Sequence, residues 1–195
     1  MSSEVWLRID EHHDVLASTD LLALIAPTLA ATPSGWKWAI LAAQNAVHGA
    51  LVCAIQDTSK TNVLTKSSAK TFLKWLETCT GDYPAQRMAD FMSLLEIFQE
   101  LYPDVIDTDQ AGRLGTLHKV FRNQFAHFVP MSWSIEIQML PPLLVAAFDF
   151  VEVAMRQDQV SLRTNGNFKR KLSSNLETAK AAVRSRMKNT GRTEL

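Results

Sequence analysis

One short stretch of this chain gathers residue types that could act together on a phosphate. Arg122, Asn123 and His127 occur in the order Arg-Asn-Gln-Phe-Ala-His. A histidine titrates near neutral pH and can move a proton to or from a sugar hydroxyl. An arginine presents a planar fork of donors to phosphoryl oxygens, and an asparagine can orient either partner. Such a set needs no metal ion and no cofactor, and we expect neither.

The stretch lies at the end of a predicted helix that runs from about residue 107 to 128. An aspartate, Asp107 or Asp109, could cap its start, and Pro130 follows its end. On a helical wheel the apolar side chains share one sector, and these are Leu114, Leu117, Phe121, Phe125 and Phe128. We expect this face to be buried.

The three polar side chains fall outside the apolar sector of the same wheel. Asn123 and His127 are four residues apart and lie on nearly the opposite face, whereas Arg122 lies on the flank. The long arginine side chain can reach toward the other two. A simpler alternative is that the asparagine and histidine only end the helix, where such residues meet free carbonyls and the helix dipole.

The rest of the chain predicts an all-α helical bundle. Only 7 glycines and 7 prolines occur among 195 residues, too few for the frequent turns of a β-sandwich or barrel. Apolar spacings of three and four predict six or seven helices, over about 10–30, 36–56, 67–78, 84–102, 107–128, 141–153 and 167–188. Residues 133–139 alternate and could form one short extended segment. We expect a helical domain over 1–160 and a basic C-terminal helix or tail over 161–195.

Charge is distributed unevenly although the net charge is zero. Residues 161–195 carry nine basic and two acidic side chains, so this segment is +7 and the remainder is −7. A basic segment on an acidic body could contact nucleic acid or pack back on the body, and both remain open. The candidate nucleic-acid contacts are Lys169, Arg170, Lys171, Arg184 and Arg186.

Targeting signals and cysteine usage predict a cytoplasmic protein that makes no membrane contact. The N-terminus lacks a basic region followed by an apolar stretch, and no run looks long and apolar enough to span a bilayer. Cys53 and Cys79 have no CxxC spacing, so we expect two reduced and mostly buried thiols.

Two other groups of polar residues have structural explanations. The cluster at residues 10–14, Asp-Glu-His-His-Asp, could be a metal site, but an acidic helix start is the simpler account. His48 lies next to the apolar face of its helix, with Gln44 one turn before it. We expect this pair to contact the helix that carries His127, and we expect His118 to be structural.

The motif and its helical context resemble the HEPN superfamily (higher eukaryotes and prokaryotes nucleotide-binding domains). The hallmark of that family is Arg, a polar residue directly after it, and His after four to six intervening residues. The stretch from Arg122 to His127 fits with four intervening residues. The resemblance covers about 36–153, and residues 121–140, with Pro130 and Trp133, are also similar to a group of uncharacterised bacterial proteins.

The resemblance implies a function and a role for each motif residue. Active HEPN members are metal-independent endoribonucleases, many from toxin–antitoxin or antiviral systems, and their two motifs meet across a dimer interface. By analogy, His127 would act as general acid or base, Arg122 would bind the scissile phosphate and Asn123 would orient them. Other members have lost catalysis and bind a protein or nucleic acid. The expected partners are therefore a second copy, RNA, and an antitoxin or other protein.

Overall fold

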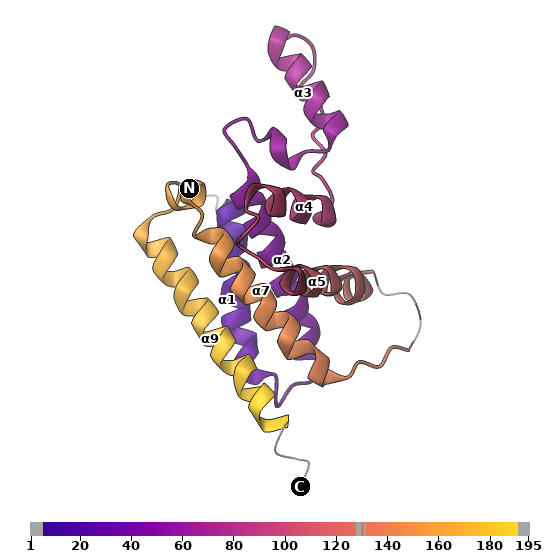
Figure 1. The fold of residues 1–195 in the computed structure, drawn as a ribbon, viewed down its shortest axis with the longest axis vertical. Helices are drawn as coiled ribbons and strands as arrows, with labels where there is room; N and C mark the ends of the chain where they lie inside the picture. Colours follow the sequence, from indigo (N-terminus) through magenta and orange to yellow (C-terminus); the bar gives the residue numbers. More distant parts are fainter. Residues whose placement is uncertain (1–5, 128–129, 131, 191–195) are drawn as a thin grey trace, which may run out of the picture.

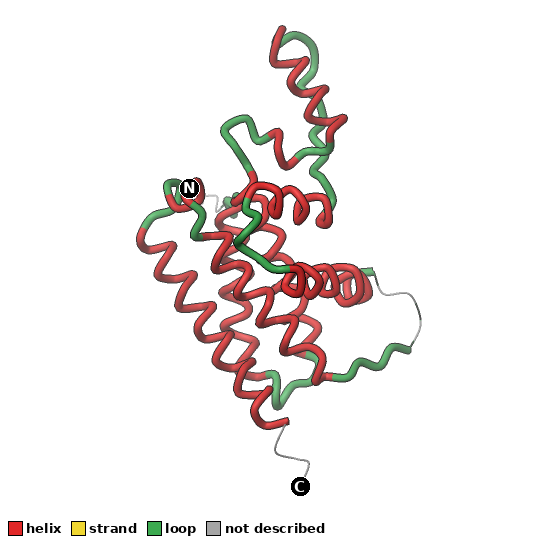
Figure 2. Tube along the Cα trace, in the orientation of Figure 1, coloured by secondary structure: helices red, strands yellow, loops and turns green. Residues whose placement is uncertain are grey.

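The chain folds as an all-α bundle, as the sequence predicts. The computed structural model describes residues 6–127, 130 and 132–190, with the backbone alone at 188–190. Within these residues the chain is helix and loop without strands, as Figure 2 shows, apart from one isolated bridge between Leu64 and Met88.

Four long helices form the body of the bundle and run along its long axis (Figure 1). They are α1 (Glu11–Ile25), α2 (Gly35–Ile55), α7 (Leu140–Met155) and α9 (Gly166–Thr190). Short helical turns η1 (Ala26–Thr28), η2 (Thr61–Val63), η4 (Ile137–Met139) and α8 (Asp158–Ser161) lie in the connections. The expected first helix ends early because Pro27 interrupts its hydrogen bonding and only a 3-10 turn follows.

Helix α2 is the centre of the core because small side chains let its neighbours approach closely. Six buried alanines line it: Ala39, Ala42, Ala43, Ala46, Ala50 and Ala54. A Cβ added at Gly49 would lie 2.7 Å from Cγ2 of Val15, which shows how closely α1 packs here. This contact leaves no room for any larger residue at position 49.

Two helical stretches in the described part are apolar enough, by length and composition, to cross a membrane. They are Gly35–Ile55 and Ile137–Met155, and 72% and 56% of their most apolar windows are buried inside the bundle. The central helices of a globular bundle have the same composition, so this property alone does not place the chain in a bilayer.

The basic C-terminal segment forms α9 and packs along α1 and α7. Its buried side chains recur at helical spacing, as Leu172, Leu176, Ala179 and Val183. Some of its cations pair with the acidic body: Lys171 with Asp20 at 2.6 Å, and Lys180 with Asp149 at 2.8 Å.

Helix α4 (Phe91–Leu101) begins later than the sequence suggested. A start near Pro84 is wrong because residues 87–89 pair with 63–65, where Thr65 donates to the Arg87 carbonyl and Ala89 to the Val63 carbonyl, each at 2.9 Å. Asp90 then caps the helix, and its Oδ1 accepts from the backbone amides of Met92 and Ser93 at 3.0 and 3.1 Å.

Helix α3 (Lys66–Thr78) projects away from the body at one end of the molecule (Figure 1). Its aromatic residues Phe72 and Trp75 have ring centroids 6.1 Å apart, and Trp75 also packs on Tyr83 of the following loop, with centroids 5.1 Å apart. The loop that returns to α4 therefore supplies much of the cover for this helix.

Candidate functional site

The single helix predicted over 107–128 is divided into three consecutive helical segments. These are α5 (Thr108–Thr116), the π-helical turn η3 (Leu117–Arg122) and α6 (Asn123–Ala126). π-helical turns are rare, and they are frequent at functional sites. The wider turn changes where each following side chain points, so a simple wheel does not describe this region.

Most of the predicted apolar face is buried. Leu114 and Leu117 are fully enclosed and Phe121 is 4% exposed. Phe125 is half-buried and packs on Trp133, with ring centroids 5.2 Å apart. Phe128, the last expected member, lies outside the described residues. The segment around Trp133 forms no strand; it covers the end of this helix and leads into η4.

The structure brings Arg122, Asn123 and His127 into contact. Nη1 of Arg122 donates to Oδ1 of Asn123 at 3.2 Å and lies 3.3 Å from Nε2 of His127. An arginine has no acceptor, so Nε2 must accept and the ring proton is on Nδ1. The helix ends at His127, whose φ of −123° and ψ of 56° leave helical geometry. This change of direction places the ring near the arginine.

The arginine also forms part of a groove that opens to solvent. The groove has a volume of about 430 Å³, and Arg122 and Ala126 line it together with side chains of α1 and α2. Its apolar walls include Leu21, 40% exposed, and Trp38, 54% exposed. His127 is exposed, whereas Arg122 is half-buried. A cation therefore lies beside an uncovered apolar surface.

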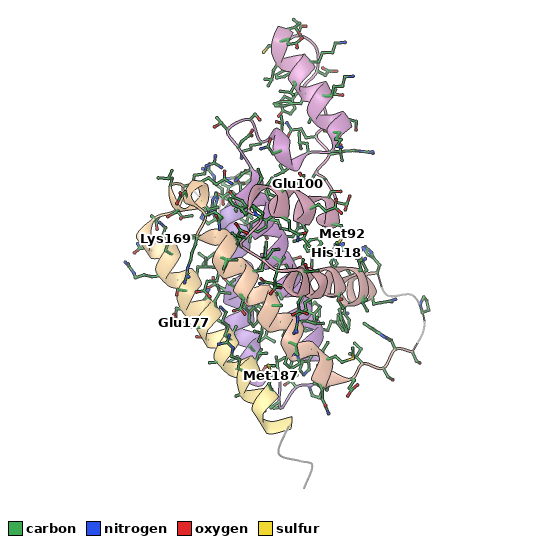
Figure 3. All side chains as sticks on the ribbon, in the orientation of Figure 1. Met92, Glu100, His118, Lys169, Glu177 and Met187 are labelled. Atoms are coloured by element: carbon green, nitrogen blue, oxygen red, sulfur yellow. The ribbon has the colours of Figure 1, made fainter. Side chains whose placement is uncertain are left out.

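A second polar cluster lies behind the motif, between α2, α4 and η3. Nε2 of Gln44 is 3.0 Å from Nδ1 of His118, and the His118 ring stacks on Phe91 with centroids 4.4 Å apart. Figure 3 shows His118 where η3 faces α4. The contact that we expected of the Gln44 and His48 pair with the helix of the motif is made by Gln44, whereas the ring of His48 packs edge-on against Phe91 of α4, with centroids 6.2 Å apart.

The electrostatics of this cluster connect it to the arginine. Burial lowers the pKa of His48 below its ordinary value, and the charge of Arg122 lowers it further, whereas Asp14 opposes both. Burial, Arg122 and His48 likewise lower the pKa of His118. Both imidazoles are therefore kept neutral beside the cation. Nε2 of His48 is buried, and no group of the described residues forms a hydrogen bond with it.

The basic residues proposed for nucleic acid lie on α9 and not in the groove. Helix α9 is separated from α5 by the body of the bundle (Figure 1). Lys169 donates to Oγ of Ser161 at 2.7 Å, Arg170 bonds to Asn167 on its own helix, and Arg184 lies 3.8 Å from Asp149. Lys171 is paired with Asp20, and Arg186 lies further along the same helix.

The remaining candidate residues have structural positions. Asp10 caps α1 and its Oδ1 accepts from the His13 amide at 2.8 Å, as expected for an acidic helix start. Cys53 is buried, and burial raises the pKa of its thiol to about 12. The expectation of a buried Cys79 is wrong: this residue ends the projecting helix α3 and is exposed.

Comparison of the chain with family models, with curated proteins and with solved structures finds no match. The motif offers a cationic donor, an exposed imidazole ring and an amide within one contact network. This combination can bind an anionic oxygen and move a proton.

Proposed function

We propose that this chain is a HEPN-like, metal-independent endoribonuclease whose site is formed by Arg122, Asn123 and His127. The observation that supports the proposal is the contact of one guanidinium nitrogen with both the asparagine oxygen and the histidine ring, at 3.2 and 3.3 Å. Phosphodiester cleavage requires that the negative charge of the phosphate is bound and that protons are transferred. Arg122 can bind the phosphate, His127 can transfer a proton and Asn123 can orient either group.

The reaction would be an internal transesterification of RNA. The 2′-hydroxyl oxygen attacks the neighbouring phosphorus, the bond to the 5′-oxygen breaks, and the products carry a 2′,3′-cyclic phosphate and a 5′-hydroxyl. One proton leaves the attacking hydroxyl and one is gained by the leaving oxygen. His127 would carry one of these protons, and Arg122 would neutralise the charge on the phosphoryl oxygens.

The contact between Arg122 and His127 suggests how substrate would prepare the site. In the free protein, Nε2 of His127 accepts from the guanidinium and is not available as a base. A phosphate is a stronger acceptor for arginine than a neutral imidazole because the bond is between opposite charges. Binding of the phosphate would therefore draw Arg122 away and release Nε2.

A second copy of the chain would supply the other proton carrier. Each chain offers one His127, whereas the reaction needs a base and an acid. The groove next to Arg122 is lined by the exposed side chains of Leu21 and Trp38, which a partner surface would cover. Two motifs that face one another across this groove would give two imidazoles to one phosphodiester.

The same exposed groove supports a second candidate, a catalytically silent module that binds another protein. Apolar walls on a surface groove mark interaction sites whether or not chemistry takes place there. In that case the groove would take an antitoxin or other partner, and no RNA would be cleaved.

One direct experiment distinguishes the ribonuclease from the catalytically silent module. Purified protein is incubated with RNA in EDTA, as wild type and as His127→Ala. The ribonuclease proposal expects cleavage by wild type and loss of at least about a hundredfold in the variant, since one positioned proton carrier typically contributes that much. His13→Ala removes another exposed imidazole outside the site and should retain full activity.

Two results would contradict the proposal. If wild type and His127→Ala cleave at the same rate, another protein or another site is responsible. If neither cleaves RNA while the groove binds a partner, the silent module is the correct account. Circular dichroism of each variant checks that the bundle remains folded.

A further inference from the structure

A small, partly enclosed cavity lies between α7, α8 and α9, away from the candidate ribonuclease site. Its volume is about 210 Å³. This is larger than the cavity of about 150 Å³ that accepts benzene and smaller than the roughly 300 Å³ at which drug-sized sites begin. The cavity therefore suits a molecule with a short apolar tail.

Apolar side chains make the inner part of this cavity. They come from α7 and α9, and the buried ones are Met155, Leu172 and Leu176, with Phe168 at the side. An apolar ligand would replace water against these surfaces and gain the free energy of burial.

The rim of the cavity carries donors for an anion. Nζ of Lys169 is 2.7 Å from Oγ of Ser161, and both residues line the cavity. Lys169 forms no ion pair with the described carboxylates, and Figure 3 shows it near the start of α9. An ammonium keeps two further donors when it bonds to one hydroxyl, and the serine hydroxyl can still donate its own hydrogen.

One carboxylate also lies at the rim, and it is already neutralised. Glu152 bonds to both Arg156 and Lys180, and the bond from Lys180 lowers the pKa of this carboxyl. Lys180 is shared with Asp149. Arg156 is therefore the cation of the cavity lining that balances the charge of Glu152. Lys169 remains as an additional positive charge, so the rim favours an anionic head over a cationic one.

We propose that this cavity binds a small amphiphile with one carboxylate head and a short apolar tail. The tail fills the space between Met155, Leu172 and Leu176, and the carboxylate accepts from Nζ of Lys169 and Oγ of Ser161. The site is independent of Arg122 and His127, so it stands whether or not the chain cleaves RNA.

Octanoate is the test ligand, with 1-octanol and octylamine as probes of the same tail length. Isothermal titration of the full chain should show binding of octanoate, with at least about tenfold weaker binding of 1-octanol and none of octylamine. The factor of ten corresponds to loss of hydrogen bonds to a charged group. Equal binding of octanoate and 1-octanol, or no binding of octanoate, would overturn the proposal.

Matched variants locate the binding site. Ser173 lines the cavity from an exposed position on α9, so Ser173→Trp should fill the space and abolish binding, whereas Ser174→Trp places the same ring outside the lining. Lys169→Gln should weaken octanoate binding about tenfold or more, and the neighbouring Arg170→Gln should not. Unchanged affinity in Ser173→Trp or in Lys169→Gln would contradict the assignment.

Discussion

Nε2 of Gln44 on α2 is 3.0 Å from Nδ1 of His118 on η3, although 74 residues separate them in the chain. The amide nitrogen is the donor, so Nδ1 accepts and the His118 ring proton is on Nε2. This hydrogen bond ties the π-helical turn to the central helix of the core. Arg122 is the last residue of that turn, so the same bond helps to fix the position of the candidate site.

Loss of this bond should be measurable as a loss of stability. Gln44 is 2% exposed, and Gln44→Met keeps its length while it removes the donor to His118. His118 is half-buried, so loss of this bond should cost about 1 kcal/mol, the lower end of the range for an unsatisfied group. Urea unfolding should show this loss, and Gln138→Met, at an exposed position, should change the free energy of unfolding by less than about 0.5 kcal/mol. Equal effects of the two variants would show that the bond does not stabilise the turn.

The neutral histidines behind the site should make stability depend on pH. Burial and the charge of Arg122 lower the pKa of both His48 and His118 in the folded chain, against an opposing effect of Asp14 and Asp90. The unfolded state therefore binds more protons once pH falls below the ordinary histidine pKa of about 6.5. The free energy of unfolding should therefore be highest above that pH, where both histidines are neutral in either state. It should fall as pH decreases from there toward the pKa values of the folded chain.

Replacement of both histidines tests this origin of the pH dependence. Urea unfolding between about pH 7.5 and 5.5 should show a clear slope for the wild type and a smaller slope for His48→Gln/His118→Gln. An identical slope in the double variant would assign the pH dependence to other groups.

The two cysteines should differ sharply in reactivity. The thiolate is the reactive form, and burial raises the pKa of the Cys53 thiol to about 12. Cys79 is exposed at the end of α3. A maleimide reagent should therefore label the native protein once and the urea-unfolded protein twice, as read by mass spectrometry. Two labels on the native wild type would contradict the packing around Cys53. One label on native Cys79→Ser would contradict it as well.

The groove next to Arg122 should be required for association of two chains. Trp38 is 54% exposed in this groove, and Trp38→Glu would place a charge on the apolar wall. Light scattering should show a dimer for the wild type and a monomer for the variant, with a parallel loss of RNA cleavage. Trp6→Glu changes a tryptophan that is 82% exposed before α1 and should leave both unchanged. A Trp38→Glu dimer with full activity would exclude this groove as the interface.

Local patterns predicted the helices well because their apolar spacing is regular. Helix α2 and helix α7 were expected almost at their observed bounds, since each has a continuous apolar face. The start of α4 was missed because Pro84 looks like a first-turn proline, whereas pairing of residues 87–89 with 63–65 decides the local structure. That pairing depends on contacts across the chain and leaves no local signal.

The sequence predicted that Arg122 could reach Asn123 and His127, but it did not predict the geometry of their contact. The motif spacing identified Arg122, Asn123 and His127, and the flank position of the arginine suggested that it could reach the others. The π-helical turn and the exit from helix at His127 set the actual contacts, and neither follows from a wheel with uniform spacing. The residues with which α1 and α2 line the groove, including Trp38, depend on how the helices pack.

Joint action of Arg122 and His127 on one phosphodiester is the central claim of this account. A double-mutant cycle measures it: single-turnover cleavage of RNA in EDTA by wild type, Arg122→Ala, His127→Ala and the double variant. Residues that act as a unit give non-additive losses, so the double variant should cleave no more slowly than the slower single variant. Losses that multiply, or a single variant as fast as the wild type, would show that the two side chains do not share one site.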